Sequence, residues 1–312
     1  MSHMTVAPES MGAHGTRRRI GVIGTGRVGA VLAAQLRAAG HDLVAVSGAS
    51  PASRLRIDTL LPGVHVTSPA EVVRLADTVV VAVPDDALIA VAEQLASQVR
   101  PGQVFAHTSG RHGLEALAAL TRAGGRAIAL HPAMTFTGTA VDLDRHPVFG
   151  LTAGPDEREL AESLVADLGG TAMWVAESDR TLYHAALAHG ANHLVTLVAQ
   201  SLDLLRDTGA EDPAAVLRPL LTAALDNALA YGDAALTGPV ARGDVTTVRA
   251  HVDAFAAADV PDATVDTYLT LARATAGRAE ADGRLSPADA GQIRQVLAEA
   301  DWDTLAEIAA GI

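Results

Sequence analysis

The chain has 312 residues, with 36 acidic side chains against 23 basic ones and no cysteine. Its length exceeds that of one usual domain, so two domains are expected. The acidic balance argues against a nucleic-acid partner, because a phosphate backbone needs a basic surface. The missing cysteine excludes disulfides, thiolate catalysis and cysteine metal sites. All 23 residues counted as Lys or Arg are arginine, which excludes a lysine acid or base.

The hydropathy of the chain argues against a membrane partner. No apolar stretch approaches the ~18 residues of a membrane span, and residues 1–16 lack the apolar core of a secretion signal. We therefore expect a cytoplasmic protein. Residues 1–16 mix Gly, Pro, Ser and His, which predicts a disordered N-terminus.

A glycine motif, Gly24-Thr25-Gly26-Arg27-Val28-Gly29, lies between an apolar run at 20–23 and a helix-like segment at 30–39. Its first glycine permits a tight turn, its second leaves room for a pyrophosphate, and its third lets helix and strand pack closely. The N–H groups of the helix start supply donors for phosphate. The motif predicts that residues 24–29 bind a dinucleotide.

Strand-like and helix-like segments alternate after this motif up to residue 176. This alternation predicts a Rossmann-like α/β domain at 17–176, with an open, doubly wound, mostly parallel sheet. The later strands are expected at 43–47, 64–66, 78–83, 103–107, 126–130, 147–152 and 171–175.

From residue 177 onward, the pattern changes to long amphipathic helices, which predict an all-α C-terminal domain at 177–312. Helices are expected at 179–208, 213–235, 244–257 and 263–282, followed by two short ones. The Leu- and Val-rich stretch at 194–205 fits either a homodimer interface or an internal core. We expect a homodimer formed through this domain.

The end of the second strand indicates which dinucleotide is bound. An NAD site usually has Asp or Glu there to bind the ribose hydroxyls, but this chain has Ser47. Arg54 follows shortly and offers a guanidinium that suits a 2′-phosphate. The sequence therefore favours NADP over NAD.

The chain resembles two-domain proteins that join a Rossmann-like NADP domain to a helical domain of unknown function, DUF2520. The family looks related to 6-phosphogluconate and 3-hydroxyacid dehydrogenases and to pyrroline-5-carboxylate reductases, and some members look like an alternative ketopantoate reductase of pantothenate synthesis. The resemblance rests on residues 24–29, Val83-Pro84-Asp85-Asp86, His107-Thr108-Ser109-Gly110, His131-Pro132, Tyr183-His184-Ala185-Ala186, Asn192-His193-Leu194 and the segment 237–244.

Polar residues follow the ends of three expected strands, where open α/β sheets bind their ligands. We expect Val83, Pro84 and Thr108 to line the nicotinamide. Ser109 is a candidate donor to a substrate carboxylate, and His131 a candidate substrate contact. His131 fits equally well as an ordinary structural histidine in a connecting loop.

The helix expected from residue 179 carries an unusual density of imidazole and amide groups on an apolar background. Related dehydrogenases have a lysine and an asparagine on the corresponding helix, but here Ala188 occupies the lysine position, four residues before Asn192. His184 is then our candidate proton donor, with Asn192 holding the carbonyl. On a regular helix the two would lie about 80° apart. His184 fits a purely structural pairing as well.

The segment 237–244 interrupts the helices with a Gly-Pro break. The resemblance makes Arg242 a candidate for binding a substrate carboxylate with two hydrogen bonds. Asp244 is well placed to cap the next helix. We expect no metal, because the pair His189 and His193 has neither a carboxylate signature nor a cysteine nearby.

These observations predict an NADPH-dependent oxidoreductase that reduces a small 2-oxo acid, with ketopantoate as the leading substrate. A cyclic imine reductase is one alternative, because a basic nitrogen needs a dedicated acid less. A non-catalytic NADP-binding regulatory protein is another, because the usual lysine is missing.

Overall fold

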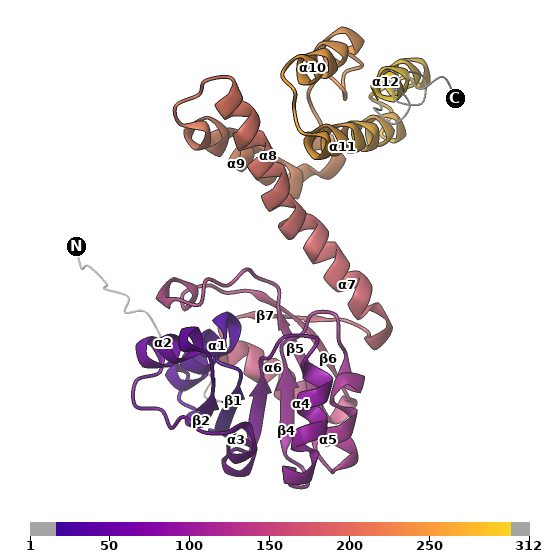
Figure 1. Cartoon of the computed structure of the whole chain (residues 1–312). Helices are drawn as coiled ribbons and strands as arrows, with labels where there is room; N and C mark the ends of the chain where they lie inside the picture. The colour runs from indigo at the N-terminus through magenta and orange to yellow at the C-terminus, as the bar shows by residue number, and fades with distance from the viewer. Residues whose placement is uncertain (1–16, 301–312) are drawn as a thin grey trace, which may run out of the picture. The chain divides into compact units, whose positions relative to one another are not determined.

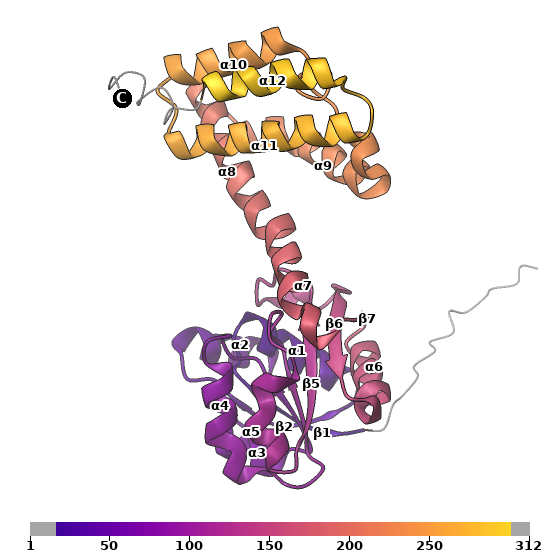
Figure 2. The ribbon, with the colours of Figure 1, turned by 90° about the vertical axis from the view of Figure 1, so that its right-hand side faces the viewer.

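The computed structural model describes residues 17–300, which form two compact units that divide at Gly190 and Ala191 (Figures 1 and 2). The first unit holds the sheet and the second is helical. The expectations for residues 1–16 and for the last terminal helix lie outside the described residues. The predicted domain boundary at 176/177 stays a prediction. None of the helices between residues 17 and 300 is long and apolar enough to cross a bilayer.

A seven-stranded sheet forms the centre of the first unit, in the order β2-β1-β3-β4-β5-β6-β7. Neighbouring strands run parallel except β5 and β6, which are antiparallel. The strands are β1 (Arg19–Ile23), β2 (Asp42–Ser47), β3 (Thr78–Val81), β4 (Val104–His107), β5 (Arg126–Pro132), β6 (Val148–Ala153) and β7 (Thr171–Trp174). The predicted fold class, a doubly wound and mostly parallel sheet, is confirmed.

Helices cover both faces of this sheet (Figure 1), because successive side chains of each strand point to opposite faces. Val80 belongs to the core on one face, whereas its neighbours Val79 and Val81 belong to the core on the other. The first core also holds side chains of α1 (Arg27–Ala38), α2 (Pro51–Leu60) and α6 (Arg158–Asp167). The second holds side chains of α3 (Pro69–Leu75), α4 (Leu88–Leu95) and α5 (Ala118–Arg122).

The prediction of a strand at 64–66 is wrong. Only one isolated bridge, between Val46 and Val66, joins this segment to the edge of the sheet. The segment follows α2 directly and then leads into the cap of α3, where Ser68 accepts a hydrogen bond from the Glu71 N–H. The segment exchanges two backbone hydrogen bonds with Val46 of β2, through His65 and Thr67, before Ser68 begins the cap of α3.

The single helix expected at 179–208 is also interrupted. The structure has α7 (Arg180–Leu187), a π-helical turn at Ala188–Asn192 and α8 (His193–Asp207). A π turn closes i→i+5 hydrogen bonds and winds less per residue than an α-helix, so the expected angle of about 80° between His184 and Asn192 does not apply. The two compact units divide within this turn.

The helical unit has its core among α10 (Val245–Ala257), α11 (Asp262–Ala281) and α12 (Pro287–Glu299), which lie side by side (Figure 2). Asp244 caps α10 by accepting the Thr247 N–H, as expected. In contrast, α8 has no buried residue, and α9 (Pro213–Tyr231) has only Pro213.

Replacing Leu117 tests the core of the sheet unit. Its side chain is fully buried in the core that it shares with α4 and β4, so Leu117→Ala should lower the free energy of unfolding by about 2–5 kcal/mol. The measurement is urea unfolding followed by Trp174 fluorescence in a Trp302→Phe background. Ile89→Ala, at a site that is 49% exposed, is the control and should change stability by less than about 0.5 kcal/mol. Equal losses in both variants would contradict this packing.

Candidate functional site

The three glycines of the turn between β1 and α1 differ in what surrounds them. A Cβ on Gly24 would lie 2.5 Å from the Ala82 carbonyl oxygen, and the residue has φ +91°. A Cβ on Gly29 would lie 2.0 Å from the Gly24 carbonyl oxygen. Both positions therefore need glycine for the protein's own packing. A Cβ on Gly26 would meet nothing within 4 Å. The protein fold does not require this glycine, but a ligand lying against the turn would.

The start of α1 is suited to an anion. Gly26 is the N-cap residue, no side chain caps the helix, and its first turn contains no acidic residue. The N–H groups of Gly24 and Thr25 both donate to the Ser47 carbonyl oxygen, which fixes the turn against β2. The positive end of the helix dipole thus has neither a capping nor an acidic side chain, and this arrangement fits the pyrophosphate of a dinucleotide.

The end of β2 supplies the candidate groups for the adenosine side. Ser47 is buried, and Ser50 caps α2 by accepting the Ser53 N–H. Arg54, expected from the sequence, is exposed. Arg56 was missed, although it lies two residues further along α2 and is half-buried. The donor set of hydroxyls and guanidinium groups, without a carboxylate, fits a 2′-phosphate better than a free ribose.

The loop between β5 and β6 lies against this region. A Cβ on Gly138 would lie 2.6 Å from Arg56 Nε and 3.0 Å from Arg27 Cα. The buried Asp142 carboxylate holds the loop by accepting the N–H groups of Thr137 and Gly138 at 2.8 and 2.7 Å. Burial alone would raise the pKa of Asp142, but these hydrogen bonds together lower it. The carboxylate therefore stays charged and keeps Gly138 beside the two arginines.

The ends of β3 and β4 place the residues expected to line the nicotinamide. Val83 is half-buried and Pro84 exposed just after β3. Thr108 follows β4 and donates its N–H to the Val81 carbonyl oxygen. Ser109 is buried, and its hydroxyl accepts the His112 N–H at 3.2 Å. These residues share the carboxyl edge of the parallel strands, and their roles toward a ligand stay predictions.

His107 is a structural residue of this edge. Its Nδ1 accepts the Ser109 N–H at 3.2 Å, so Nε2 carries the ring proton and donates to the Gly113 carbonyl oxygen at 3.0 Å. Burial is the main reason that the pKa of His107 falls to about 4. The ring is therefore neutral at physiological pH, and it holds the loop that contains Ser109.

His131, Tyr183 and His184 form an aromatic cluster beside that loop. His131 Nδ1 lies 2.8 Å from the Tyr183 hydroxyl, and the His131 and His184 ring centroids are 6.0 Å apart. A Cβ on Gly110 would lie 2.5 Å from His184 Cδ2 and 3.0 Å from His131 Nε2. Glycine at 110 thus allows both rings to reach the end of β4. The structure brings the predicted residues Ser109, His131 and His184 together.

Arg180 lies behind this cluster and was not singled out from the sequence. It is 1% exposed and donates to the carbonyl oxygens of Ser109 and Gly150 and to the Thr152 hydroxyl. Its Nε is buried without a hydrogen-bond partner. Among residues 17–300, no carboxylate forms an ion pair with it. Only its position at the start of α7, amid polar residues, could have drawn attention to it.

Two predicted residues lie in the helical unit. Asn192 ends the π turn and is exposed. Arg242 is exposed in the turn before α10, where its N–H donates to the Gly238 carbonyl oxygen. Asn192 and Arg242 belong to the second unit, whereas His184 and Ser109 belong to the first. The proposed joint roles of these residues therefore stay predictions.

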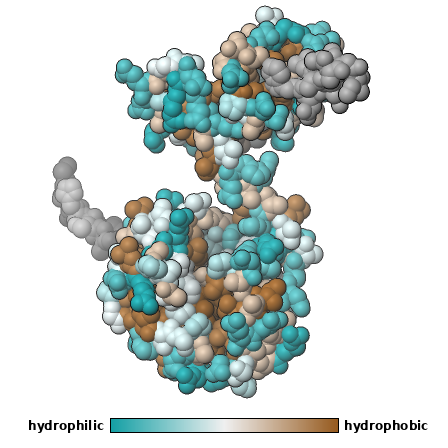
Figure 3. Space-filling model, viewed as in Figure 1, coloured by the Kyte–Doolittle hydropathy of each residue, from teal (hydrophilic) through white to brown (hydrophobic). Residues whose placement is uncertain are grey.

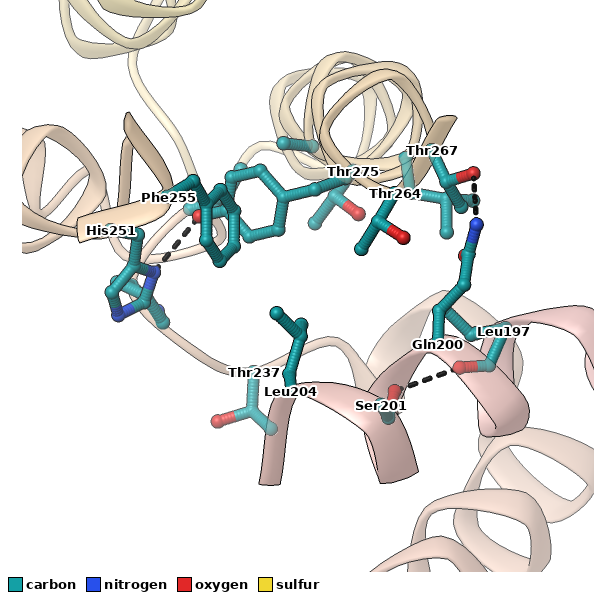
Figure 4. Close-up of a pocket in the computed structure, with 15 residues that line it drawn as sticks. Leu197, Gln200, Ser201, Leu204, Thr237, His251, Phe255, Thr264, Thr267 and Thr275 are labelled. Carbon is teal, nitrogen blue, oxygen red and sulfur yellow. Dashed lines mark hydrogen bonds between the residues drawn. The ribbon is translucent and has the colours of Figure 1, made fainter. Parts of the chain in front are cut away.

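The helical unit also encloses a cavity of about 300 Å³ among α8, α10 and α11 (Figure 4). Its polar groups are mostly hydroxyls and amides, and no Asp, Glu or Arg lines it. His251 Nδ1 and the Tyr268 hydroxyl are 2.9 Å apart at its wall. The cavity offers a neutral surface with no group that carries a permanent charge.

The glycine turn provides a test of the dinucleotide site. Gly26→Ala should change the free energy of unfolding by less than about 1 kcal/mol, because its Cβ meets open space. The same change should weaken NADPH binding at least about tenfold, measured by calorimetry. The matched variant Gly29→Ala should instead destabilise the protein by about 1–3 kcal/mol through overpacking. Unchanged NADPH affinity in Gly26→Ala would contradict the site.

Solved structures with this fold include several reductases. A Bacteroides fragilis protein provisionally named an NADP oxidoreductase matches with a TM-score of 0.71 at 21% identity, over 83% of this chain and 98% of its own. An imine reductase from Pseudomonas sp. matches with a TM-score of 0.62 at 20% identity, over 86% and 99%. A reductive aminase from Aspergillus terreus, in complex with NADPH and ethyl levulinate, matches with a TM-score of 0.63 at 17% identity, over 89% and 99%.

Family models confirm the resemblance seen in the sequence. A comparison with curated proteins gave no match. The Rossmann-like domain model matches residues 4–132, and the model of the domain of unknown function DUF2520 matches residues 147–275. The chain therefore belongs to the proteins that join a Rossmann-like domain to a DUF2520 domain.

Proposed function

We propose that this protein is an NADPH-dependent reductase of a small 2-oxo acid, with ketopantoate as the leading substrate. The observation that carries the proposal is the space at Gly26, which the protein's own packing leaves empty at the start of a helix. The likeness to an NADP oxidoreductase and to a reductive aminase complexed with NADPH supports the same chemistry.

NADPH is the preferred cofactor because the end of β2 has no carboxylate for the ribose hydroxyls. Ser47 stands in the position of that carboxylate, and Arg54 and Arg56 follow on α2. Arg27 begins α1 beside them. These guanidinium groups match the charge of a 2′-phosphate. When bound, NADPH supplies the hydride.

The protein's own residues would bind and protonate the substrate. Ser109 and Arg242 are proposed to hold its carboxylate, and Asn192 its carbonyl oxygen. His184 and His131 both lie at the carboxyl edge of the sheet, so both are candidates for the proton that completes the reduction. No lysine competes for this role.

Reduction of a cyclic imine is the second candidate. An imine reductase shares the fold over 86% of this chain. An imine nitrogen is basic enough to arrive protonated, so this reaction tolerates the missing lysine better than carbonyl reduction does.

NADPH oxidation with ketopantoate and with a cyclic imine, each repeated with NADH, tests the proposal. We expect turnover with NADPH that exceeds turnover with NADH, and a lower kcat in His184→Ala if His184 donates the proton. Tight NADPH binding without turnover of any oxo acid or imine would instead indicate a non-catalytic NADP-binding protein.

We also propose that the protein is a homodimer formed through the helical unit. Val195 on α8 is 70% exposed, and Leu220 and Leu229 on α9 are 64% and 79% exposed. Apolar side chains reach the surface of this unit (Figure 3). The three-helix core of the unit does not cover them. Such a surface is typical of an association interface.

Light scattering after gel filtration tests this interface. We expect the mass of a dimer for the wild type, and a shift toward monomer at the same concentration for Val195→Asp and Leu229→Asp, because a buried charge opposes association. Ile89→Asp on α4 is the control and should leave the mass unchanged. A monomeric wild type would contradict the proposal.

A further inference from the structure

We propose that Tyr183 and His131 form a proton relay that protonates the substrate's carbonyl oxygen, and that Arg180 stabilises the phenolate that the relay leaves behind. This inference rests on the proposed function and names the acid that replaces the missing lysine. His131 is then the catalytic residue, while Tyr183 and Arg180 act through it.

The relay begins with a short contact between side chains from distant segments. The Tyr183 hydroxyl lies 2.8 Å from His131 Nδ1, and the two rings meet edge to face at 87°. Gly150 on β6 pairs with His131 on β5. A Cβ on Gly150 would lie 2.5 Å from the Tyr183 oxygen, so glycine is needed for the phenol to reach this position.

In the proposed relay, the phenol donates its own proton to His131 Nδ1, which lies 2.8 Å from the phenol oxygen. Neutral His131 then carries its proton on Nε2. Among the described residues, no hydrogen bond engages this nitrogen. It lies close to Gly110 at the sheet edge, where a Cβ would come within 3.0 Å of it.

Arg180 supplies the charge that the relay needs. Its guanidinium carbon lies 5.8 Å from the centre of the Tyr183 ring, and its hydrogen bonds within residues 17–300 go to neutral oxygens. Glu177 and Asp85 attract this cation without forming an ion pair with it, and a buried cation without an ion-pair partner is costly. A phenolate at Tyr183 would be such a partner, and it would form only during the reaction.

The proton step balances without a further reagent. As the carbonyl carbon gains the hydride that bound NADPH would supply, the developing alkoxide would take the proton from His131 Nε2, and a new O–H bond would form. His131 Nδ1 at the same time takes the proton of the Tyr183 hydroxyl, so the imidazole stays neutral and its tautomer switches. The negative charge ends on the Tyr183 oxygen, and solvent water later returns the proton.

The protonation states at rest agree with this sequence of events. Burial, and then the charges of Arg180 and His184, lower the pKa of His131 to about 4, whereas Asp85 opposes them weakly. Burial raises the pKa of Tyr183, against the effects of Arg180 and the Gly150 backbone. Both groups are therefore neutral near pH 7, and the phenol holds the proton that it is to donate.

Long-range proton–nitrogen spectra of the cofactor-free protein test the hydrogen bond. From about pH 5 to pH 8, His131 should show a protonated Nε2 and an unprotonated Nδ1. Tyr183→Phe should convert this pattern to a tautomer mixture. Tyr268→Phe removes a similar tyrosine–histidine bond in the helical unit and should leave the His131 signals unchanged. A wild-type His131 protonated on Nδ1 would overturn the relay.

Steady-state kinetics test the role of the hydrogen bond. Tyr183→Phe should lower kcat for ketopantoate by about 10²-fold or more, with little change in NADPH affinity, and Tyr268→Phe should leave kcat unchanged. An N-alkylated cyclic iminium accepts hydride without needing a proton. The Tyr183→Phe variant should therefore catalyse reduction of this iminium at the wild-type rate. The acid limb of the Tyr183→Phe pH profile should shift as well, because the His131 tautomer is no longer fixed.

The outcomes separate the relay from the proposed function. If Tyr183→Phe retains the wild-type kcat for ketopantoate, or if His184→Ala alone abolishes it, the relay is wrong while the reductase stands. If Tyr183→Phe lowers kcat for the iminium as much as for ketopantoate, Tyr183 has a structural role, and the relay is also overturned. If no carbonyl compound and no iminium supports NADPH oxidation by the wild type, the proposed function fails. The relay then fails with it, even where His131 shows the expected nitrogen pattern.

Discussion

Arg180 joins three segments that meet at the carboxyl edge of the sheet. Its guanidinium holds the Ser109 carbonyl oxygen after β4 and the Gly150 carbonyl oxygen on β6, while its backbone begins α7. It thereby ties the loop containing Ser109 and the start of α7 to β6, beside the contacts that His107 and Tyr183 make. Burial is the main reason that the pKa of His131 is low, and the positive charge of Arg180 adds to it, so that His131 stays uncharged. One side chain thus contributes to both the shape and the electrostatics of the candidate site.

The sequence predicted the features that depend on local patterns. The glycine motif between β1 and α1 and most of the strands follow from turn chemistry and from runs of buried residues, and they lie close to where they were expected. The segment at 64–66 pairs with β2 at one bridge only, because the chain turns into the cap of α3 at Ser68. The π turn at Ala188–Asn192 leaves no mark on the apolar periodicity of the long helix.

The grouping of His131 with Tyr183 could not be predicted, because it depends on the register of an antiparallel pair. Gly150 must lie opposite His131 for the phenol to fit beside both, and that pairing brings together residues from distant parts of the chain. Arg180 and Arg56 were missed for a similar reason. An arginine on a helix usually faces solvent, and only the packed structure distinguishes a buried guanidinium from an exposed one.

The emptiness around Gly26 has a consequence for anyone who would engineer this chain. Programmes that raise heat tolerance replace residues that the unbound fold can spare, and glycines are among their usual targets. By that criterion Gly26 looks expendable, since, its two neighbours in the chain aside, no atom of residues 17–300 lies within 4 Å of the place where a methyl group would stand. A thermostabilised variant selected in this way would resist heating, but it would have lost the space that the proposed cofactor needs.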